Sequence, residues 1–358
     1  MTELGTSAIE SRVVFESDTK AFTVRDLIDS AHFRGEIAEP WQNFLRVVAA
    51  ENKADEAGQE ADDDAIAAAA EQFRYQHDLI TAEETEKWLA EHGIDLGDFS
   101  SYFVRQFWSA TAEEDAPSAG KDFEASAEDL RALFTIELTL SGELDTMAAR
   151  ASWRVAARAA TQEIDAEQLA LAQANFRERH GLDETTEADW LGKLGRDCEW
   201  LRAQLELEAA YEHDCAKLLT PAARGHEISA LRLPLTSFEV ETLEFDSLDA
   251  AREGLLCVRD DGMSMEEVAT EGRYPYRHTD VLLEDVPEDL QQKFLSVTPG
   301  DVLEPIAHGE SFHLCRIIAK AEPNVDDPLV KSRAEDRILD RHFDELTSRH
   351  VSWKGVLG

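Results

Sequence analysis

Apolar residues recur every three or four positions through the first part of the chain, the spacing that lines one face of an amphipathic helix. The predicted helices cover residues 41–50, 65–73, 98–108 and 198–219, together with a segment that opens at the capping box Thr81-Ala82-Glu83-Glu84 and stops near Gly93. We expect the longest of them to end at Thr220-Pro221, followed by a connecting segment at 222–233. Residues 1–35 are expected to be irregular, apart from a short strand at 12–15 and a short helix at 23–31.

The helical part of the chain contains an internal repeat. The pattern Phe-Arg-x-x-His-x-Leu begins at Phe73 and again at Phe176, and the pattern Trp-Leu-x-x-x-Gly begins at Trp88 and again at Trp190. Aromatic, histidine and glycine positions that match at matching spacings predict a duplicated helical unit, roughly over 36–108 and 146–215.

The histidine of each repeat allows two interpretations. His77 and His180 could form a paired site, or each could end a helix against the negative end of its dipole, with Asp78 or Gly181 starting the turn. No second ligand lies at metal-binding spacing, so the second interpretation is favoured and no metal site is expected.

The hydrophobic period changes from helical to mixed over residues 237–323. The predicted strands cover 238–245, 302–306 and 311–318, and a polar turn at 307–310 separates the last two. The predicted helices cover 247–258 and 287–297, and a third begins at a capping box on Ser264. This order of strand, three helices and two strands predicts a small α+β sandwich.

The last predicted strand carries a histidine among apolar residues. Alternation gives it two faces, one with Phe312, Leu314 and Arg316 and the other with His313, Cys315 and Ile317. On physical grounds alone, His313 is either a core histidine satisfied by a neighbour or part of a site.

A final helix is marked by the apolar stripe Val330, Ala334, Ile338, Phe343 and Leu346, with Trp353 after it. We expect this segment to pack back on the N-terminal helices. Residues 109–125, rich in Ala, Glu, Asp, Pro, Ser and Gly, predict a linker. The predicted class is therefore α+β, divided into one helical repeat at 1–115, a second repeat with a connecting helix at 126–222, the α+β module at 235–323 and the returning helix at 324–358.

Charge limits the choice of partners. The formal net charge of −40 argues strongly against nucleic acid and anionic membrane surfaces as partners, because their phosphates would be repelled. The acidity fits either a solvated surface, as in a high-salt cytosol, or a field that recruits basic peptides. The sequence shows neither an apolar run of membrane-spanning length nor a signal peptide, and its four cysteines lack CxxC spacing. A cytoplasmic protein with reduced thiols is expected.

Familiar catalytic patterns are missing: the sequence has no Gly-rich phosphate loop, no HExxH, no GxSxG and no CxxC, and no cofactor is expected. The module carries instead the segments Thr242-Leu243-Glu244-Phe245, Asp261-Gly262-Met263-Ser264-Met265, Val286-Pro287-Glu288-Asp289-Leu290, Pro299-Gly300 with Pro305, and Phe312-His313. In order and spacing these resemble the parvulin-type (PpiC or rotamase) peptidyl-prolyl cis-trans isomerases, with a shortened middle. Together with the helical arm and the returning helix, the chain looks like a SurA-type foldase chaperone. A related cytosolic set accompanies ribosomally made peptides during maturation or export, and the duplicated arm resembles that set more than a secreted foldase.

The resemblance assigns roles residue by residue. The second histidine of the family falls on His313, while the first falls on Thr242; these two would form the catalytic set. The apolar pair that holds the proline ring falls on Val286 and Leu290, smaller than the usual Met and Phe, with Phe312 beside them.

The central Asp or Cys of the family and its Gly-rich stretch have no clear counterpart in this sequence. Tyr276, His278 and Asp280 lie nearby, and the first two are candidates for peptide binding.

Proline isomerisation needs no nucleophile, because its barrier of about 18–20 kcal/mol comes from amide resonance. An enzyme lowers this barrier by gripping the proline ring and stabilising the twisted amide. Two functions therefore stay open. One is a foldase that binds extended Pro-containing peptides with isomerase activity near His313. The other is an inactive binding protein that presents a precursor peptide to a modifying enzyme or exporter, favoured by the degraded catalytic set. A third hypothesis is a purely structural helical scaffold that binds no peptide.

Overall fold

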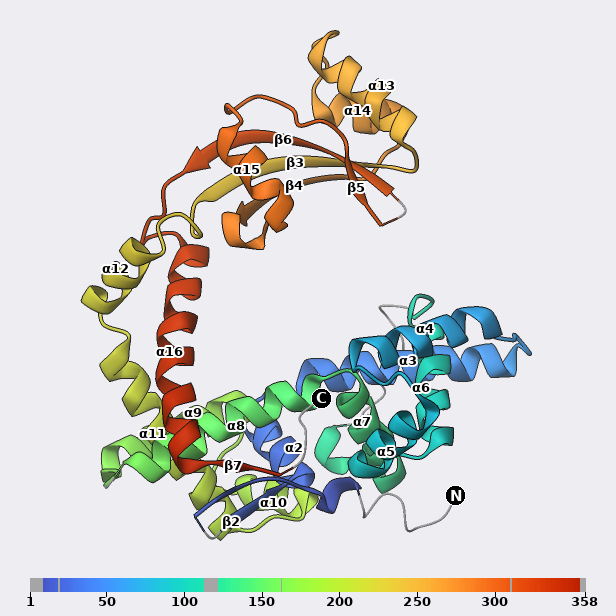
Figure 1. Ribbon diagram of the computed structural model, residues 1–358. Helices are drawn as coiled ribbons and strands as arrows, with labels where there is room; N and C mark the ends of the chain where they lie inside the picture. The colour runs from blue at the N-terminus through green and yellow to red at the C-terminus, as the bar shows by residue number, and fades with distance from the viewer. Residues whose placement is uncertain (1–8, 19, 113–121, 162, 310, 355–358) are drawn as a thin grey trace. The chain divides into compact units, whose positions relative to one another are not determined.

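The computed structural model describes residues 9–18, 20–112, 122–161, 163–309 and 311–354 (Figure 1). The chain divides into two compact units. Unit 1 contains Met1–Cys215 and His342–Gly358, and unit 2 contains Ala216–Arg341. Most of the predicted linker at 109–125 lies outside the described residues.

Unit 1 contains two runs of four helices in the same order. The first run is α3 (Ala38–Glu56), α4 (Asp63–Gln76), α5 (Ala82–His92) and α6 (Leu96–Ser109). The second run is α8 (Glu143–Ala160), α9 (Ala166–His180), α10 (Glu187–Leu194) and α11 (Cys198–Leu218). Between the runs lie the 3-10 turn η1 (Phe123–Ala125) and α7 (Glu128–Leu140). The structure confirms the duplicated helical arm.

The repeated aromatic residues have matching geometry in the two copies. Phe73 meets Trp88 edge-on, with ring centroids 5.5 Å apart at 78°, and Phe176 meets Trp190 at 5.1 Å and 74°. Each histidine closes its helix: His77 is the C-cap of α4, and His180 is the last residue of α9. The repeated aromatic residues therefore pack in the core of each helical unit, and each histidine lies at a helix end, as the second interpretation expects.

A small sheet joins the two ends of the chain. Strands β1 (Val13–Ser17), β2 (Lys20–Thr23) and β7 (Ser352–Trp353) lie in the order β2-β1-β7. The expectation of an irregular start was wrong for β2, and the predicted short helix is α2 (Val24–Phe33), which opens on a Thr23 capping box. The missed strand is only four residues long, so alternation gives it little signal.

The C-terminal helix, α16 (Pro328–His350), packs back on the arm only from His342 onward, whereas Val330 and Ala334 of its first half pack in unit 2, so the prediction for the apolar stripe was wrong for these two residues. Its Phe343 is fully buried and stacks on Trp153 of α8, with ring centroids 5.3 Å apart at 19°. Tyr211 of α11 covers the same ring at 5.0 Å. In β7, Trp353 meets Phe15 of β1 edge-on. Aromatic burial therefore holds the returning segment in unit 1.

Unit 2 is built on a four-stranded antiparallel sheet (Figure 1). Its strands are β3 (Ser237–Phe245), β4 (Tyr276–Leu282), β5 (Ile306–His308) and β6 (Ser311–Ala321), in the order β4-β3-β6-β5. Its remaining elements are α12 (Pro221–Ala230), α13 (Leu248–Arg259), α14 (Met265–Gly272), η2 (Leu283–Asp285), α15 (Glu288–Ser296) and the first part of α16.

Helices cover both faces of this sheet, which confirms the predicted α+β sandwich. Helices α13 and α14 pack on the face that carries Leu243, Phe245 and Leu314. Helix α15 packs on the opposite face, with Val240 and Ile317. The alternation predicted for β6 is confirmed, because consecutive residues of β6 join different cores.

Three predictions for unit 2 were wrong. The expected order lacked β4, whose middle residues are exposed on both faces and therefore show no hydrophobic alternation. The connecting segment at 222–233 is mostly the helix α12, which starts at Pro221 after a Thr220 cap. The strand predicted at 302–306 is reduced to a single bridge between Val302 and Arg316, and pairing resumes only at β5.

Candidate functional site

The two residues assigned to catalysis lie on the α15 side of the sheet. Thr242 on β3 stands opposite Cys315 on β6, and its Oγ1 lies 3.8 Å from the Cys315 Sγ. His313 is two residues away along β6, opposite Glu244. The antiparallel register thus puts Thr242 and His313 on one face but pairs each with a different neighbour.

The imidazole of His313 belongs to a small polar group at the sheet end. Its ring stacks on His308 of β5, with centroids 4.5 Å apart, and its Nε2 lies 4.0 Å from a Glu244 carboxylate oxygen. Burial, and then the neighbouring His308, lower the pKa of His313, while Glu244 opposes the shift. A neutral imidazole here can donate one hydrogen bond and accept one, and its neighbours on this face include Ile306, directly opposite on β5, as well as His308 and Glu244.

The apolar pair expected to grip a proline ring is packed into the core. Val286 and Leu290 expose only 6 % and 8 % of their surface, and they pack with Phe238, Phe294 and Leu303. Side chains of the protein itself therefore occupy the space around both residues. In this structure they offer little surface to a ligand.

The other predicted peptide-binding residues lie on the opposite face of the sheet. The Tyr276 hydroxyl donates to Glu241 at 2.7 Å, and His278 Nε2 lies 2.8 Å from Glu239. The Glu241 carboxylate, which accepts this bond, raises the pKa of Tyr276 to about 12. Phe312 packs with the α13 and α14 core. The sheet therefore separates these three residues from Thr242 and His313.

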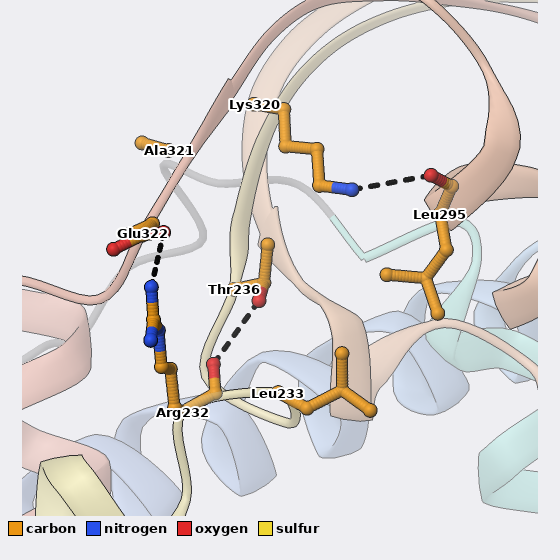
Figure 2. A pocket seen from close by; sticks show the side chains of 7 residues that line it. All are labelled: Arg232, Leu233, Thr236, Leu295, Lys320, Ala321 and Glu322. Atoms are coloured by element: carbon orange, nitrogen blue, oxygen red, sulfur yellow. Dashed lines mark hydrogen bonds and ion pairs between the residues drawn. The ribbon is translucent and has the colours of Figure 1, made fainter.

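A pocket that sequence reasoning missed lies where β3 begins and β6 ends. It has a volume of about 450 Å³ and is lined by Arg232, Leu233, Thr236, Leu295, Lys320, Ala321 and Glu322 (Figure 2). The lining is mainly apolar, and Leu233 exposes 57 % of its surface. Three segments far apart in the chain contribute to this pocket, so no local motif signals it.

Polar contacts fix the rim of this pocket. Arg232 pairs with Glu322, and Lys320 Nζ donates to the Leu295 carbonyl oxygen at 3.2 Å (Figure 2). The Thr236 hydroxyl donates to the Arg232 carbonyl oxygen at 3.1 Å. With their charged ends held in this way, the aliphatic stems of Arg232 and Lys320 add to the apolar wall.

Comparison with solved structures gives foldases and chaperones. The chain is similar to the foldase protein PrsA of Streptococcus pneumoniae, with 17 % identity over 60 % of this chain and 88 % of that one, at a TM-score of 0.29. It is similar to PrsA of Lactococcus lactis, with 10 % identity over 96 % and 95 % and a TM-score of 0.29. It is also similar to a SurA-like chaperone of Campylobacter jejuni, with 9 % identity over 61 % and 88 % and a TM-score of 0.20.

No family model matches the chain. No curated protein matches it either. At such low identities and TM-scores, the function has to be derived from the residues of this chain.

The described residues contain no group of three or more His, Cys, Asp or Glu side chains placed to hold a metal ion. The four cysteines are free, and only Cys315 is buried. Among the described helices, none combines the length and apolar character that a membrane span requires. The Leu233 pocket is a surface on which an apolar group of a ligand can be held.

Proposed function

We propose that this protein is a chaperone-like binder of extended, unfolded peptides, and that its parvulin-like module contributes binding rather than rapid proline isomerisation. The open apolar pocket around Leu233 carries the proposal. Its volume of about 450 Å³ suits one or two apolar side chains of a client. Burying one Leu or Phe side chain there would contribute about 1.5–3 kcal/mol to binding.

Isomerase activity is expected to be weak. Lowering a barrier of about 18–20 kcal/mol requires a firmly held proline ring beside groups that stabilise the twisted amide. Thr242 supplies a hydroxyl where the family has an imidazole, and Val286 and Leu290 are buried. A low level of isomerase activity is the second candidate function, favoured because Thr242, His313 and Cys315 share one face.

A finer form of the proposal concerns the client and the compartment. We place the protein in the cytosol, where its four free cysteines would stay reduced. A precursor peptide held by it could be presented to a modifying enzyme or exporter. The net charge of −40 favours basic clients over acidic ones.

Calorimetric titration of the full chain with an unfolded, Pro-containing peptide tests the binding. We expect saturable binding that weakens at least tenfold in Leu233→Glu, because a carboxylate would have to be buried in the pocket. Leu256→Glu is the matched control, since Leu256 is also an exposed leucine of unit 2, at 48 %, and does not line this pocket. Absent binding, or an equal effect of both substitutions, would contradict the proposal.

A proline-isomerisation assay distinguishes a peptide binder from an active isomerase. We expect the rate with the intact protein to stay close to the uncatalysed rate and to be unchanged in His313→Ala. Substantial catalysis that disappears in His313→Ala would establish the second candidate instead.

A further inference from the structure

Strand β4 is an open edge of the sheet in unit 2. All seven of its residues pair with β3, from Tyr276 opposite Leu243 to Leu282 opposite Ser237. On the other side of β4, the described residues provide no strand and no backbone hydrogen bond to it. Such an edge presents unpaired N–H and C=O groups that can template another extended chain.

The hydrogen-bond alternation of an antiparallel pair identifies the free groups. Glu244 N donates to the Pro275 carbonyl oxygen, and Leu283 N donates to the Thr236 carbonyl oxygen, so odd-numbered residues from 275 to 283 bond toward β3. The even-numbered residues Tyr276, His278 and Asp280 therefore direct their N–H and C=O groups to the open edge, where the Asp280 carbonyl oxygen also accepts a long hydrogen bond from the Thr279 hydroxyl at 3.4 Å.

Side chains on this edge leave the backbone accessible. Tyr276 and His278 reach back over the sheet to carboxylates of β3, Glu241 and Glu239, at 2.7 Å and 2.8 Å. The β3–β4 register is free of bulges. The strand also lacks proline, and it is more than twice as long as the opposite edge strand β5. Bulges, prolines and short length are three of the usual protections of an edge, and β4 has none of them; its charged residues Arg277 and Asp280 restrict which partner fits.

Charge indicates which partner fits. Glu239, Glu241 and the exposed Asp280 lie on the same face of the sheet, along β3 and β4. A strand added beside β4 would place every second side chain next to Tyr276, His278 and Asp280, with Glu239 and Glu241 one strand further away and Glu241 also paired with Arg316 at 3.7 Å. Lys or Arg at those positions would be attracted, whereas a second copy of this chain would bring another net charge of −40.

We propose that an extended client peptide with Lys or Arg at alternate positions adds to β4 as a fifth strand of the sheet. This inference rests on the proposed function and specifies how the client is held. Main-chain hydrogen bonds to Tyr276, His278 and Asp280 supply sequence-independent affinity, and the carboxylates of β3 and β4 select the basic residues.

Synthetic peptides test the inference on the full chain. The probe is Ac-Lys-Val-Lys-Val-Lys-Val-Lys-NH2, and its Glu counterpart is the charge control. We expect saturable binding of the Lys peptide by calorimetry and at least tenfold weaker binding of the Glu peptide. Hydrogen exchange should slow at the amides of Tyr276, His278 and Asp280 when the Lys peptide is present.

Backbone pairing is separated from charge by two matched comparisons. N-methylation of one alternate set of peptide amides should abolish binding, whereas methylation of the other set should leave it nearly unchanged. In the protein, His278→Pro removes an edge donor, and we expect it to bind about three- to tenfold more weakly than His278→Ala, which keeps that donor. If His278→Pro fails to fold, the methylated peptides still decide the question.

Each contrary result has a distinct meaning. If an unfolded client binds but the β4 amides stay unprotected, or both methylated peptides bind alike, strand addition is overturned while the proposed function stands. If neither the client nor the Lys peptide binds, both fall. If sedimentation shows a dimer that His278→Pro disrupts, the edge serves a second copy of this chain and the inference is wrong.

Discussion

Replacing Asp29 by asparagine should destabilise unit 1 more than most single substitutions. Asp29 is fully buried in α2 and sits among three arginines. Its carboxylate oxygens lie 2.7 Å from Arg196 Nε, 3.1 Å from Arg131 Nη2 and 3.5 Å from Arg25 Nε. Arg131 belongs to α7, and Arg196 lies between α10 and α11, so one carboxylate connects α2 to both parts of the arm.

The expected loss of unfolding free energy depends on the contacts that each arginine keeps after the substitution. Removing one member of a buried ion pair costs about 3–5 kcal/mol, because a charge is left without its partner. Here Arg196 still pairs with Asp26 at 2.9 Å, and Arg131 still lies over the Phe123 ring at 4.7 Å. Arg25 keeps a hydrogen bond to the Leu194 carbonyl oxygen. We therefore expect the low end of the range, about 3 kcal/mol.

Tryptophan fluorescence during urea unfolding at neutral pH is the suitable assay. All seven tryptophans of the chain lie within unit 1, so the signal reports on the unfolding of that unit alone. Asp55→Asn, an exposed change in α3, is the control and should alter the unfolding free energy by less than about 0.5 kcal/mol.

Double-mutant cycles sharpen the test. The coupling of Asp29 to Arg196, whose side chain is 18 % exposed, should be about 2 kcal/mol. The coupling to Arg25, whose side chain is 42 % exposed and screened by water, should stay below about 1 kcal/mol. A loss below about 1 kcal/mol in Asp29→Asn, or equal coupling to both arginines, would refute this reasoning.

Three further predictions concern pH, packing and the imidazole. Burial raises the pKa of Glu137 to about 7, so the stability from this group is present below pH 4.5 and is lost as the pH rises through 7. As the pH rises from 4.5 to 7, the unfolding free energy of Glu137→Gln, measured in urea titrations, should increase by about 3 kcal/mol relative to that of the wild type. A difference between the two proteins that does not change with pH would contradict the burial argument. A Cβ at Gly254 of α13 would meet the Phe245 ring at 2.6 Å, so Gly254→Ala should cost about 1–3 kcal/mol in thermal melts. Gly225→Ala in α12, with open space around it, should instead stabilise by about 0.5–1 kcal/mol, and similar signs for both would be inconsistent with the packing. His313→Ala should leave client affinity within about twofold, because His313 lies outside the Leu233 pocket; a larger loss would place the client on the His313 face.

Much of the fold follows from local patterns. The spacing of Phe73 and Trp88 recurs at Phe176 and Trp190 because each pair must meet inside its own helical unit. Alternation along β6 predicts its two faces without reference to its partner strands. These features are short-range, so periodicity reports them directly.

Other features depend on contacts that no local pattern encodes. As an edge strand, β4 is exposed on both faces and carries no alternation. Helix α12 begins at a proline that also reads as a helix breaker. Tyr276 and His278 were chosen because they lie near the place of the family's central Asp or Cys, but their side of the sheet is set by the register of β4 against β3. The pocket at Leu233 needs three distant segments, so it becomes visible only in the folded chain.

Photo-crosslinking tests most directly whether the client occupies the Leu233 pocket. A photoreactive leucine analogue is placed at position 233, or at position 256 as the reference, and the full chain is irradiated with an unfolded Pro-containing peptide. We predict a crosslink to the peptide from position 233 and none from position 256. Crosslinking from position 256 alone, or from neither position at saturating peptide, would contradict the account.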